Sequence, residues 1–245
     1  MGYPKSSLLP EPQETTAEVE RLREINERLV MLTAHELRTP LTHILAYLRL
    51  RQESAPMSER CELDVVVEQA LALKERLDQV LLLDQLEAGL YELHCAPLSI
   101  QETIGRAIET QRCHIEEKKL TLDMQVECSA IVWGDRELLT RALDHLIANA
   151  CKFSLPRGIV EVRVDCAETL CCVRVSDHGI GIATEKQSQI FEPFFQVEMT
   201  RSRRYNGLGI GLHLVRAIAE KHGGSIQVQS KVGYGSTFTM MIPLP

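Results

Sequence analysis

Two long stretches of regularly spaced apolar residues open the chain and predict two amphipathic helices. Apolar residues recur at three- and four-residue steps over residues 14–53 and again over residues 58–89. Pro56 interrupts the pattern between them, because proline lacks an amide hydrogen and disfavours helix in the residue before it. A lone helical hairpin leaves one apolar face in water, so we expect two copies to pair as a dimeric four-helix bundle.

The rest of the chain predicts a different architecture, in which short helices and strands are mixed. Helical periodicity predicts helices over residues 99–119, 135–152 and 212–221. Alternation of apolar and polar residues predicts strands, which are 120–127, 131–133, 159–164, 170–176, 225–230 and 237–242. This mixture favours an α+β two-layer sandwich.

Composition and charge narrow the class of protein. We expect a disordered, proline-containing lead-in over residues 1–13, an all-α module over 14–90 and an α+β module over 91–245.

The net charge of −7 argues against a general nucleic-acid binder. No apolar run reaches the roughly 20 residues of a membrane span. We interpret the 8 cysteines as reduced, mostly buried hydrophobes of a cytosolic protein, because their spacings match no zinc or redox motif.

The first candidate site is the segment His35-Glu36-Leu37-Arg38-Thr39-Pro40-Leu41, in the middle of the first predicted helix. An imidazole with one unprotonated nitrogen is a nucleophile, and the neighbouring Glu36 can hold the other ring N–H and accept its proton. Thr39 lies one helical turn after His35 and shares its face. The alternative is an inert, solvated histidine. Arg38 is explained equally well as a charge near a phosphoryl group or as part of a solvated face.

A second candidate site lies near the end of the predicted helix over residues 135–152. The amide oxygen of Asn149 suits Mg²⁺, which takes oxygen ligands and completes its shell with water and phosphates. Lys152 can offset phosphate charge. The alternative explanation is structural, because polar residues and lysines are common at helix C-termini.

Two glycine-rich segments follow and suit a bound nucleotide. Asp177 comes directly after a predicted strand, and its carboxylate can accept a hydrogen bond from the adenine amino group, which guanine lacks at that position. Gly179 and Gly181 allow tight backbone geometry beside the base. The second segment leads into the predicted helix over residues 212–221, whose positive end favours phosphates. Its residues are Gly207, Gly209, Gly211 and Leu212.

A polar, basic stretch over residues 196–206 separates the two glycine-rich segments. It carries Arg201, Arg203 and Arg204. We expect this stretch to form a mobile lid over the nucleotide and to become ordered when the phosphates arrive. The alternative is an ordinary solvated loop.

In this order the motifs closely resemble those of the sensor histidine kinases of two-component signalling, from about Glu18 to the last residue. The resemblance implies that His35 accepts a phosphoryl group from ATP and passes it to an aspartate on a response-regulator receiver domain. It implies that Glu36 assists the kinase step, and that Glu36 and Thr39 support dephosphorylation of the regulator. The second module resembles the Bergerat-type ATP-binding fold that these kinases share with gyrase and Hsp90.

The resemblance also implies the cofactors and the setting. ATP and Mg²⁺ are the expected cofactors, with Asn149 as the metal ligand. His145 occupies a position where asparagine is commonest in the family, and imidazole is a poorer magnesium ligand, so we assign His145 to the edge of the nucleotide site. We also group Thr237 with the nucleotide-binding residues. The expected setting is a homodimer in the bacterial cytoplasm, with any membrane anchor outside this chain.

Two other functions remain open at this point. One is an ATPase without transfer to histidine, which needs a glutamate base on the nucleotide helix; Glu137 lies on that helix but near its start. The other is a degenerate kinase that binds and sequesters a regulator. The appearance of label from ATP on the protein distinguishes both from a histidine kinase.

Overall fold

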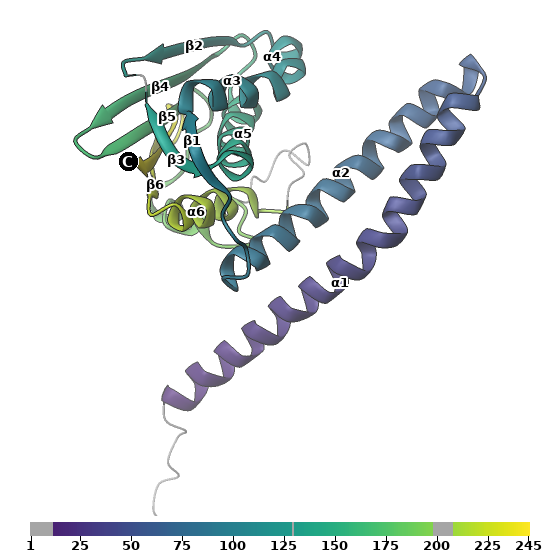
Figure 1. The fold of residues 1–245 in the computed structure, drawn as a ribbon, viewed down its shortest axis with the longest axis horizontal. Helices are drawn as coiled ribbons and strands as arrows, with labels where there is room; N and C mark the ends of the chain where they lie inside the picture. The colour runs from purple at the N-terminus through teal and green to yellow at the C-terminus, as the bar shows by residue number, and fades with distance from the viewer. Residues whose placement is uncertain (1–11, 129, 198–207) are drawn as a thin grey trace, which may run out of the picture. The chain divides into compact units, whose positions relative to one another are not determined.

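The computed structural model describes residues 12–128, 130–197 and 208–245, without the side chains of residues 12–20, 22–31, 35 and 57. It divides into two compact units, Met1–Asp84 and Gln85–Pro245 (Figure 1). The division falls six residues before the boundary expected at residue 90. Residues 1–11 of the expected lead-in lie outside the described residues.

The first unit consists of two long helices, as the apolar pattern predicts. α1 spans Pro12–Ser54, and α2 begins at Met57 and ends at Glu87, so that its last turn belongs to the second unit. Arg38 of α1 forms a salt bridge of 2.8 Å with Asp78 of α2. Arg38 therefore links the two helices, a role that the sequence did not suggest.

The hairpin buries only part of its apolar surface. Leu41 and Leu45 of α1 and Leu81 of α2 are buried. Other large apolar side chains remain exposed, namely Leu37, Ile44, Tyr47, Leu50, Val65, Val66 and Leu73. Among the described residues, no helix is both long enough and apolar enough to cross a bilayer.

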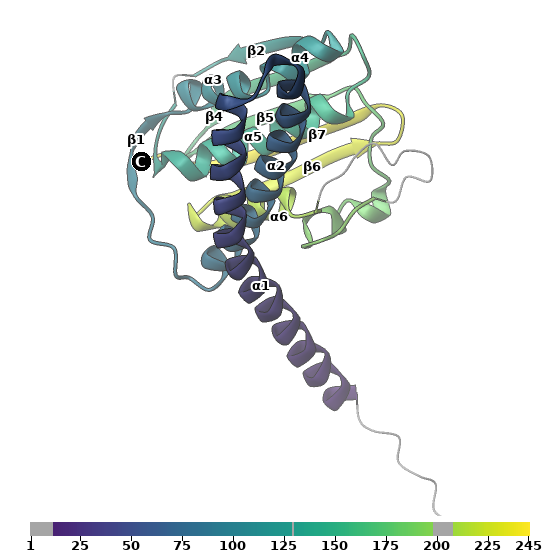
Figure 2. The ribbon, with the colours of Figure 1, turned by 90° about the vertical axis from the view of Figure 1, so that its right-hand side faces the viewer.

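The second unit is a two-layer α+β sandwich, which confirms the predicted fold class. Its five-stranded sheet has the order β2-β4-β5-β7-β6, in which β2 and β4 are parallel and the other neighbours antiparallel (Figures 1 and 2). The strands are β2 Thr121–Val126, β4 Ile159–Ala167, β5 Leu170–Asp177, β6 Ser225–Lys231 and β7 Gly235–Pro243. The helix layer consists of α3 Ile100–Thr110, α5 Arg136–Phe153 and α6 Gly211–Lys221.

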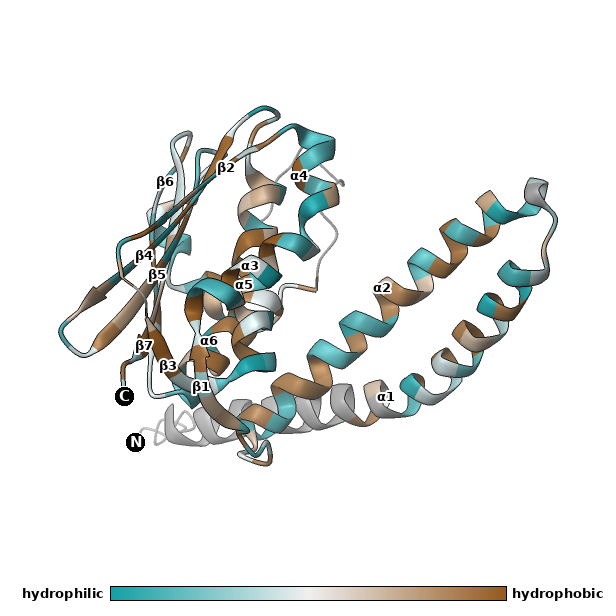
Figure 3. Cartoon of the chain, turned by 45° about the horizontal axis from the view of Figure 1, so that its top comes forward, coloured by the Kyte–Doolittle hydropathy of each residue, from teal (hydrophilic) through white to brown (hydrophobic). Residues whose placement is uncertain are grey.

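The hydrophobic core lies between the sheet and the helix layer (Figure 3). Successive strand residues point to opposite faces, so the inner face carries one alternate set of side chains. Its buried members include Val162, Val175 and Met240, and Leu143 of α5 and Ile218 of α6 are likewise fully buried. The outer face carries the other set, and no described helix covers it (Figures 1 and 3).

Two smaller features differ from the sequence-based expectation. The helix expected over residues 99–119 is divided into α3 and α4 (Arg112–Lys118) at Gln111, whose buried side chain donates to Asp144 of α5 at 2.7 Å. Strand β1 (Cys95–Ser99) was not predicted. It contains Pro97 and pairs with β3 (Ile131–Asp135) in a separate two-stranded sheet, where an edge position tolerates proline.

The interpretation of the cysteines as reduced and mostly buried is wrong in two respects. Three of the eight are buried, namely Cys151, Cys171 and Cys172, and one pair is oxidised. Cys128 and Cys166 form a disulfide, with their Cα atoms 6.1 Å apart. Cys128 lies just after β2, and Cys166 lies on the neighbouring strand β4. Parallel pairing of these strands brings together two cysteines that are 38 residues apart, and short-range spacing motifs do not detect such a pair.

Candidate functional site

The site begins with a strip of polar residues along α5. Asp135 caps the N-terminus of this helix, because its carboxylate accepts from the backbone N–H groups of Glu137 and Leu138. The apolar face of α5 is buried against the sheet and α3. His145, Asn149 and Lys152 follow one another at intervals of four and three residues, so they share a face, and all three are half-buried.

A lysine from a neighbouring helix fixes the C-terminal end of α5. The ammonium group of Lys118 donates to the carbonyl oxygens of Cys151, Lys152 and Ser154 at 2.9, 2.6 and 3.3 Å. The last carbonyls of a helix have no intrahelical partner, and a positive charge beside them is favourable. Lys118 thus holds the turn that carries Lys152.

Asp177 is the last residue of β5, and its side chain is buried, with 6% exposed. The backbone N–H of Gly179 donates to Oδ1 of Asp177 at 2.9 Å. A Cβ atom on Gly179 would overlap the carbonyl oxygen of Phe153, so only glycine fits there. This close approach places Asp177 beside the end of α5.

Burial raises the pKa of the Asp177 carboxyl above its ordinary value. The backbone N–H groups of Gly179 and Ser236 and the charge of His178 act in the opposite direction. The carboxylate that we expect to read adenine therefore depends on these donors to remain ionised.

The start of α6 completes the site. Gly209 has φ of +73°, and a Cβ atom on it would lie 2.6 Å from the carbonyl oxygen of Phe195. A Cβ atom on Gly211 would lie 3.3 Å from Nδ1 of His145. Leu212 is in the first turn of α6. Thus the polar strip of α5, the loop after Asp177 and the beginning of α6 meet.

Family models match both units of the chain. Residues 25–89 match the His Kinase A (phospho-acceptor) domain, and residues 134–245 match the family of histidine kinase-, DNA gyrase B- and HSP90-like ATPases. The chain belongs to the sensor histidine kinases. The second unit of this kinase is accordingly its ATP-binding domain.

Curated relatives and solved structures agree with this assignment. The kinase is 36% identical over 217 residues to the circadian input-output histidine kinase CikA of Synechococcus elongatus, covering 86% of this chain and 29% of CikA. It is 29% identical over 236 residues to the autoinducer 2 sensor kinase/phosphatase LuxQ of Vibrio parahaemolyticus, covering 93% and 27%. The crystal structure of full-length ShkA with AMPPNP matches with a TM-score of 0.75 at 25% identity, covering 89% of this chain and 46% of ShkA. The chain spans less than a third of the length of CikA and LuxQ.

Several predicted site residues lie elsewhere. Glu36 and Thr39 are exposed on α1, in the first unit. His35 is also on α1, but its side chain lies outside the described part. The lid arginines and the first glycine of the second glycine-rich segment are likewise outside the described residues; these are Arg201, Arg203, Arg204 and Gly207.

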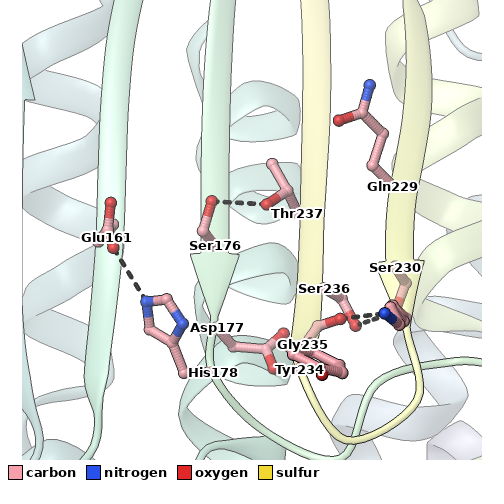
Figure 4. A pocket seen from close by; sticks show the side chains of 11 residues that line it. Glu161, Ser176, Asp177, His178, Gln229, Ser230, Tyr234, Gly235, Ser236 and Thr237 are labelled. Carbon is pink, nitrogen blue, oxygen red and sulfur yellow. Dashed lines mark hydrogen bonds and ion pairs between the residues drawn. The ribbon is translucent and has the colours of Figure 1, made fainter.

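Thr237 lies next to the residues around Asp177, but its side chain points to the other face of the sheet. Its hydroxyl contacts that of Ser176 at 2.9 Å, and both side chains are on the outer face of the sheet (Figure 4). The register pairs Asp177 with Ser236 and Ser176 with Thr237. Ser236, the residue before the predicted one, is therefore on the side of the nucleotide residues.

A polar hollow of about 490 Å³ lies at this end of the sheet and is lined by residues of both faces (Figure 4). Glu161, Ser176 and Thr237 are register partners across β4, β5 and β7 and line it, together with His178. His178 Nε2 lies 3.0 Å from Glu161, and this hydrogen bond lowers the pKa of the Glu161 carboxyl. Asp177 also lines the hollow.

The sequence-based reasoning missed three residues that support the loop after Asp177. Ser230, Ser236 and Gln187 form hydrogen bonds around this loop. Serine and glutamine are ordinary surface residues, so their types gave no signal. The alternation of β6 and β7 gives a partial signal, because it places Ser230 and Ser236 on the same face as the buried Phe238.

Replacing Asp177 by asparagine is expected to stabilise the nucleotide-free kinase while removing the carboxylate that we expect to bind adenine. A carboxyl whose pKa is raised by folding costs stability when ionised, and this cost is complete above the folded pKa. Asp177→Asn removes the charge and keeps an oxygen for the N–H of Gly179. We expect the free energy of unfolding at pH 7 to rise by roughly 0.5–2 kcal/mol. Urea unfolding checks this, and the gain should shrink as the pH falls through the pKa of Asp177; a loss of stability at pH 7 contradicts it.

Proposed function

We propose that this chain binds Mg·ATP in its second unit and transfers the γ-phosphoryl group to His35 of its first unit, in the bacterial cytoplasm. The observation that carries the proposal is that α5, which carries Asn149, is approached at His145 by Gly211 and at Phe153 by the loop after Asp177. The second unit follows a domain that matches the phospho-acceptor family. Asn149, Asp177 and Gly211 each offer a different part of an Mg·ATP site.

Different residues of the second unit bind different parts of the nucleotide. Asp177 accepts the adenine amino group, and the backbone amides at the start of α6 bind phosphates. Lys152 and the lid arginines offset the phosphate charge. Among the described residues, no group of three or more His, Cys, Asp or Glu side chains is placed to hold a metal. The amide oxygen of Asn149 would hold Mg²⁺, with phosphates and water completing the shell, because magnesium takes oxygen ligands and keeps several waters.

When bound, Mg²⁺ neutralises the charge of the phosphates. This chain's own residues then carry out the transfer. One ring nitrogen of His35 attacks the γ-phosphorus, so that a P–N bond forms as the bond between the γ-phosphorus and the bridging oxygen breaks and ADP leaves. Glu36 holds the N–H of the other ring nitrogen and accepts its proton.

We propose a homodimer and a receiver-domain partner. The many large apolar side chains exposed on α1 and α2 support pairing, because a partner helix would remove them from water. The phosphoryl group then passes from His35 to an aspartate of a response regulator. Glu36 and Thr39, both exposed on α1, support removal of that phosphoryl group. The similarity to a protein named sensor kinase/phosphatase supports this second activity.

Incubation with γ-³²P-ATP and Mg²⁺ tests the proposal. We expect label on the protein that is stable in alkali and lost in acid, as a phosphoramidate requires, and absent in His35→Gln. Added receiver domain should take up the label and release it as phosphate, and Thr39→Ala should slow only the release. Release of phosphate without labelled protein favours the ATPase alternative. Tight nucleotide binding with neither product favours the sequestering alternative, and either result contradicts the proposal.

A further inference from the structure

The hydroxyl group of Ser230 joins the loop after Asp177 to the turn between β6 and β7. The backbone N–H of Ile182 donates to Ser230 Oγ at 2.8 Å, and Ser230 Oγ donates to the carbonyl oxygen of Gly235 at 2.8 Å. Its third contact is with Oγ of Ser236 at 2.9 Å (Figure 4). A serine hydroxyl has one hydrogen, which is used on Gly235, so Ser236 is the donor to Ser230.

This hydroxyl stands in the same row of the sheet as the Asp177 side chain. The register pairs Asp177 with Ser236 and Ser236 with Ser230, so the three side chains lie side by side on the inner face. Ser236 is the middle member. Its backbone N–H favours the ionised form of the Asp177 carboxyl and lowers the pKa of that group, and its hydroxyl donates to Ser230. Ser236 therefore lies between Ser230 and the Asp177 carboxylate in the sheet.

The backbones of the loop after Asp177 and of the β6–β7 turn are also in close contact. Cβ atoms on Gly181 and Gly235 would overlap the carbonyl oxygens of Lys231 and Asp177, respectively. The side-chain amide of Gln187 donates to the carbonyl oxygens of Ile182 and Ser230 at 3.1 and 2.8 Å. The two segments are therefore in close backbone contact, and the Ser230 hydroxyl forms side-chain hydrogen bonds with both.

We propose that Ser230 is a positioning residue for base recognition: its hydroxyl holds Ser236 and Ile182 so that the Asp177 carboxylate keeps its direction toward the adenine amino group. The inference rests on the proposed role of Asp177 as the adenine acceptor. Ser230 itself is not required to touch the nucleotide. Its effect reaches the base through Ser236 on one side and through the loop ending at Ile182 on the other.

The electrostatics of Asp177 provide a readout that loss of stability alone does not change. Burial raises the pKa of this carboxyl, and the N–H groups of Gly179 and Ser236 and the charge of His178 lower it. Loosening Ser236 weakens one of the lowering contributions, so the carboxyl gains a proton at higher pH. A protonated carboxyl presents fewer acceptor sites to adenine. Affinity for an adenine nucleotide should then begin to fall at higher pH than in the wild type.

Calorimetric titration of the full chain with Mg·AMPPNP and with its guanine analogue Mg·GMPPNP, each between pH 5 and 8, tests the inference. We expect Ser230→Ala to weaken binding of Mg·AMPPNP by about tenfold, as the loss of roughly one net hydrogen bond implies. The preference for adenine over guanine should shrink. The decrease in affinity for Mg·AMPPNP on acidification should begin at higher pH than in the wild type. Ser230→Thr keeps the hydroxyl and should restore all three properties.

Two further variants serve as controls. Ser225→Ala makes the same change at an exposed position at the other end of β6 and should bind as the wild type does. Gln187→Ala leaves the strands unaltered and should show a smaller change in the same direction as Ser230→Ala. It carries the test if thermal unfolding shows that Ser230→Ala does not fold.

The outcomes separate this inference from the proposed function. If Asp177→Asn leaves the preference for adenine unchanged, the proposed role of Asp177 is wrong. If Asp177→Asn removes the preference but Ser230→Ala alters neither the preference nor the pH dependence, Ser230 is only structural and this inference is overturned. A failure of Ser230→Thr to restore binding overturns it equally.

Discussion

Asn149→Asp is expected to reduce the initial rate of autophosphorylation by about 100-fold or more while leaving the dimer intact. The substitution places a negative charge beside the triphosphate and removes the amide, at a position on the polar strip of α5 that is half-buried. Loss of one preorganised polar contact to the reacting phosphates typically costs two to three orders of magnitude in rate. The rate of ³²P incorporation measures the effect, and light scattering measures the dimer.

Gln227→Glu is the matched control for this change. It also converts an amide to a carboxylate, but at an exposed position of β6 paired with Thr239. Its autophosphorylation rate should stay within about twofold of the wild-type rate, because an exposed charge is screened by water and salt. Normal autophosphorylation by Asn149→Asp would falsify the assignment of the metal ligand.

Gly235→Ala is expected to destabilise the second unit far more than Gly233→Ala. Both glycines have positive φ, +104° and +81°, so any side chain strains the backbone at either position. They differ in their surroundings. A Cβ atom on Gly235 would overlap the carbonyl oxygen of Asp177, whereas a Cβ atom on Gly233 meets nothing within 4 Å. We expect a loss of about 1 kcal/mol for Gly233→Ala and roughly 3 kcal/mol or more for Gly235→Ala.

Urea unfolding of the two variants, with unchanged dependence on denaturant, measures this difference. Nucleotide binding should follow the same order, because the clash at Gly235 displaces Asp177, the proposed adenine acceptor. Equal losses of stability in the two variants would show that backbone strain alone determines the loss. The β6–β7 turn could then shift away from the loop after Asp177 without further loss of stability.

Local periodicity predicted most of the fold. The two long helices, α5 with its Asp135 cap and the β4–β5 and β6–β7 pairs all follow from the spacing of apolar residues. The exceptions depend on partners distant in sequence. Gln111, where α3 ends, donates to Asp144 of α5, and the Cys128–Cys166 disulfide depends on the pairing of β2 with β4.

The candidate site was predictable where one element supplies the geometry. The strip of His145, Asn149 and Lys152 follows from helical spacing alone. The contribution of β7 could not be predicted in this way. The choice between Ser236 and Thr237 depends on which alternate side chains of this strand face the helices. That choice is made by pairing with β5, and the residue types on either side are too similar to reveal it.

The back-to-back arrangement of Ser236 and Thr237 limits how this domain tolerates insertions and deletions. One residue added or removed between Lys231 and Gly235 would shift β7 by one position relative to β6 and exchange its two faces. Phe238 would then turn toward water. The exposed tip, Val232 and Tyr234, can vary in residue type, but the length of the turn is fixed by both the core and the nucleotide site.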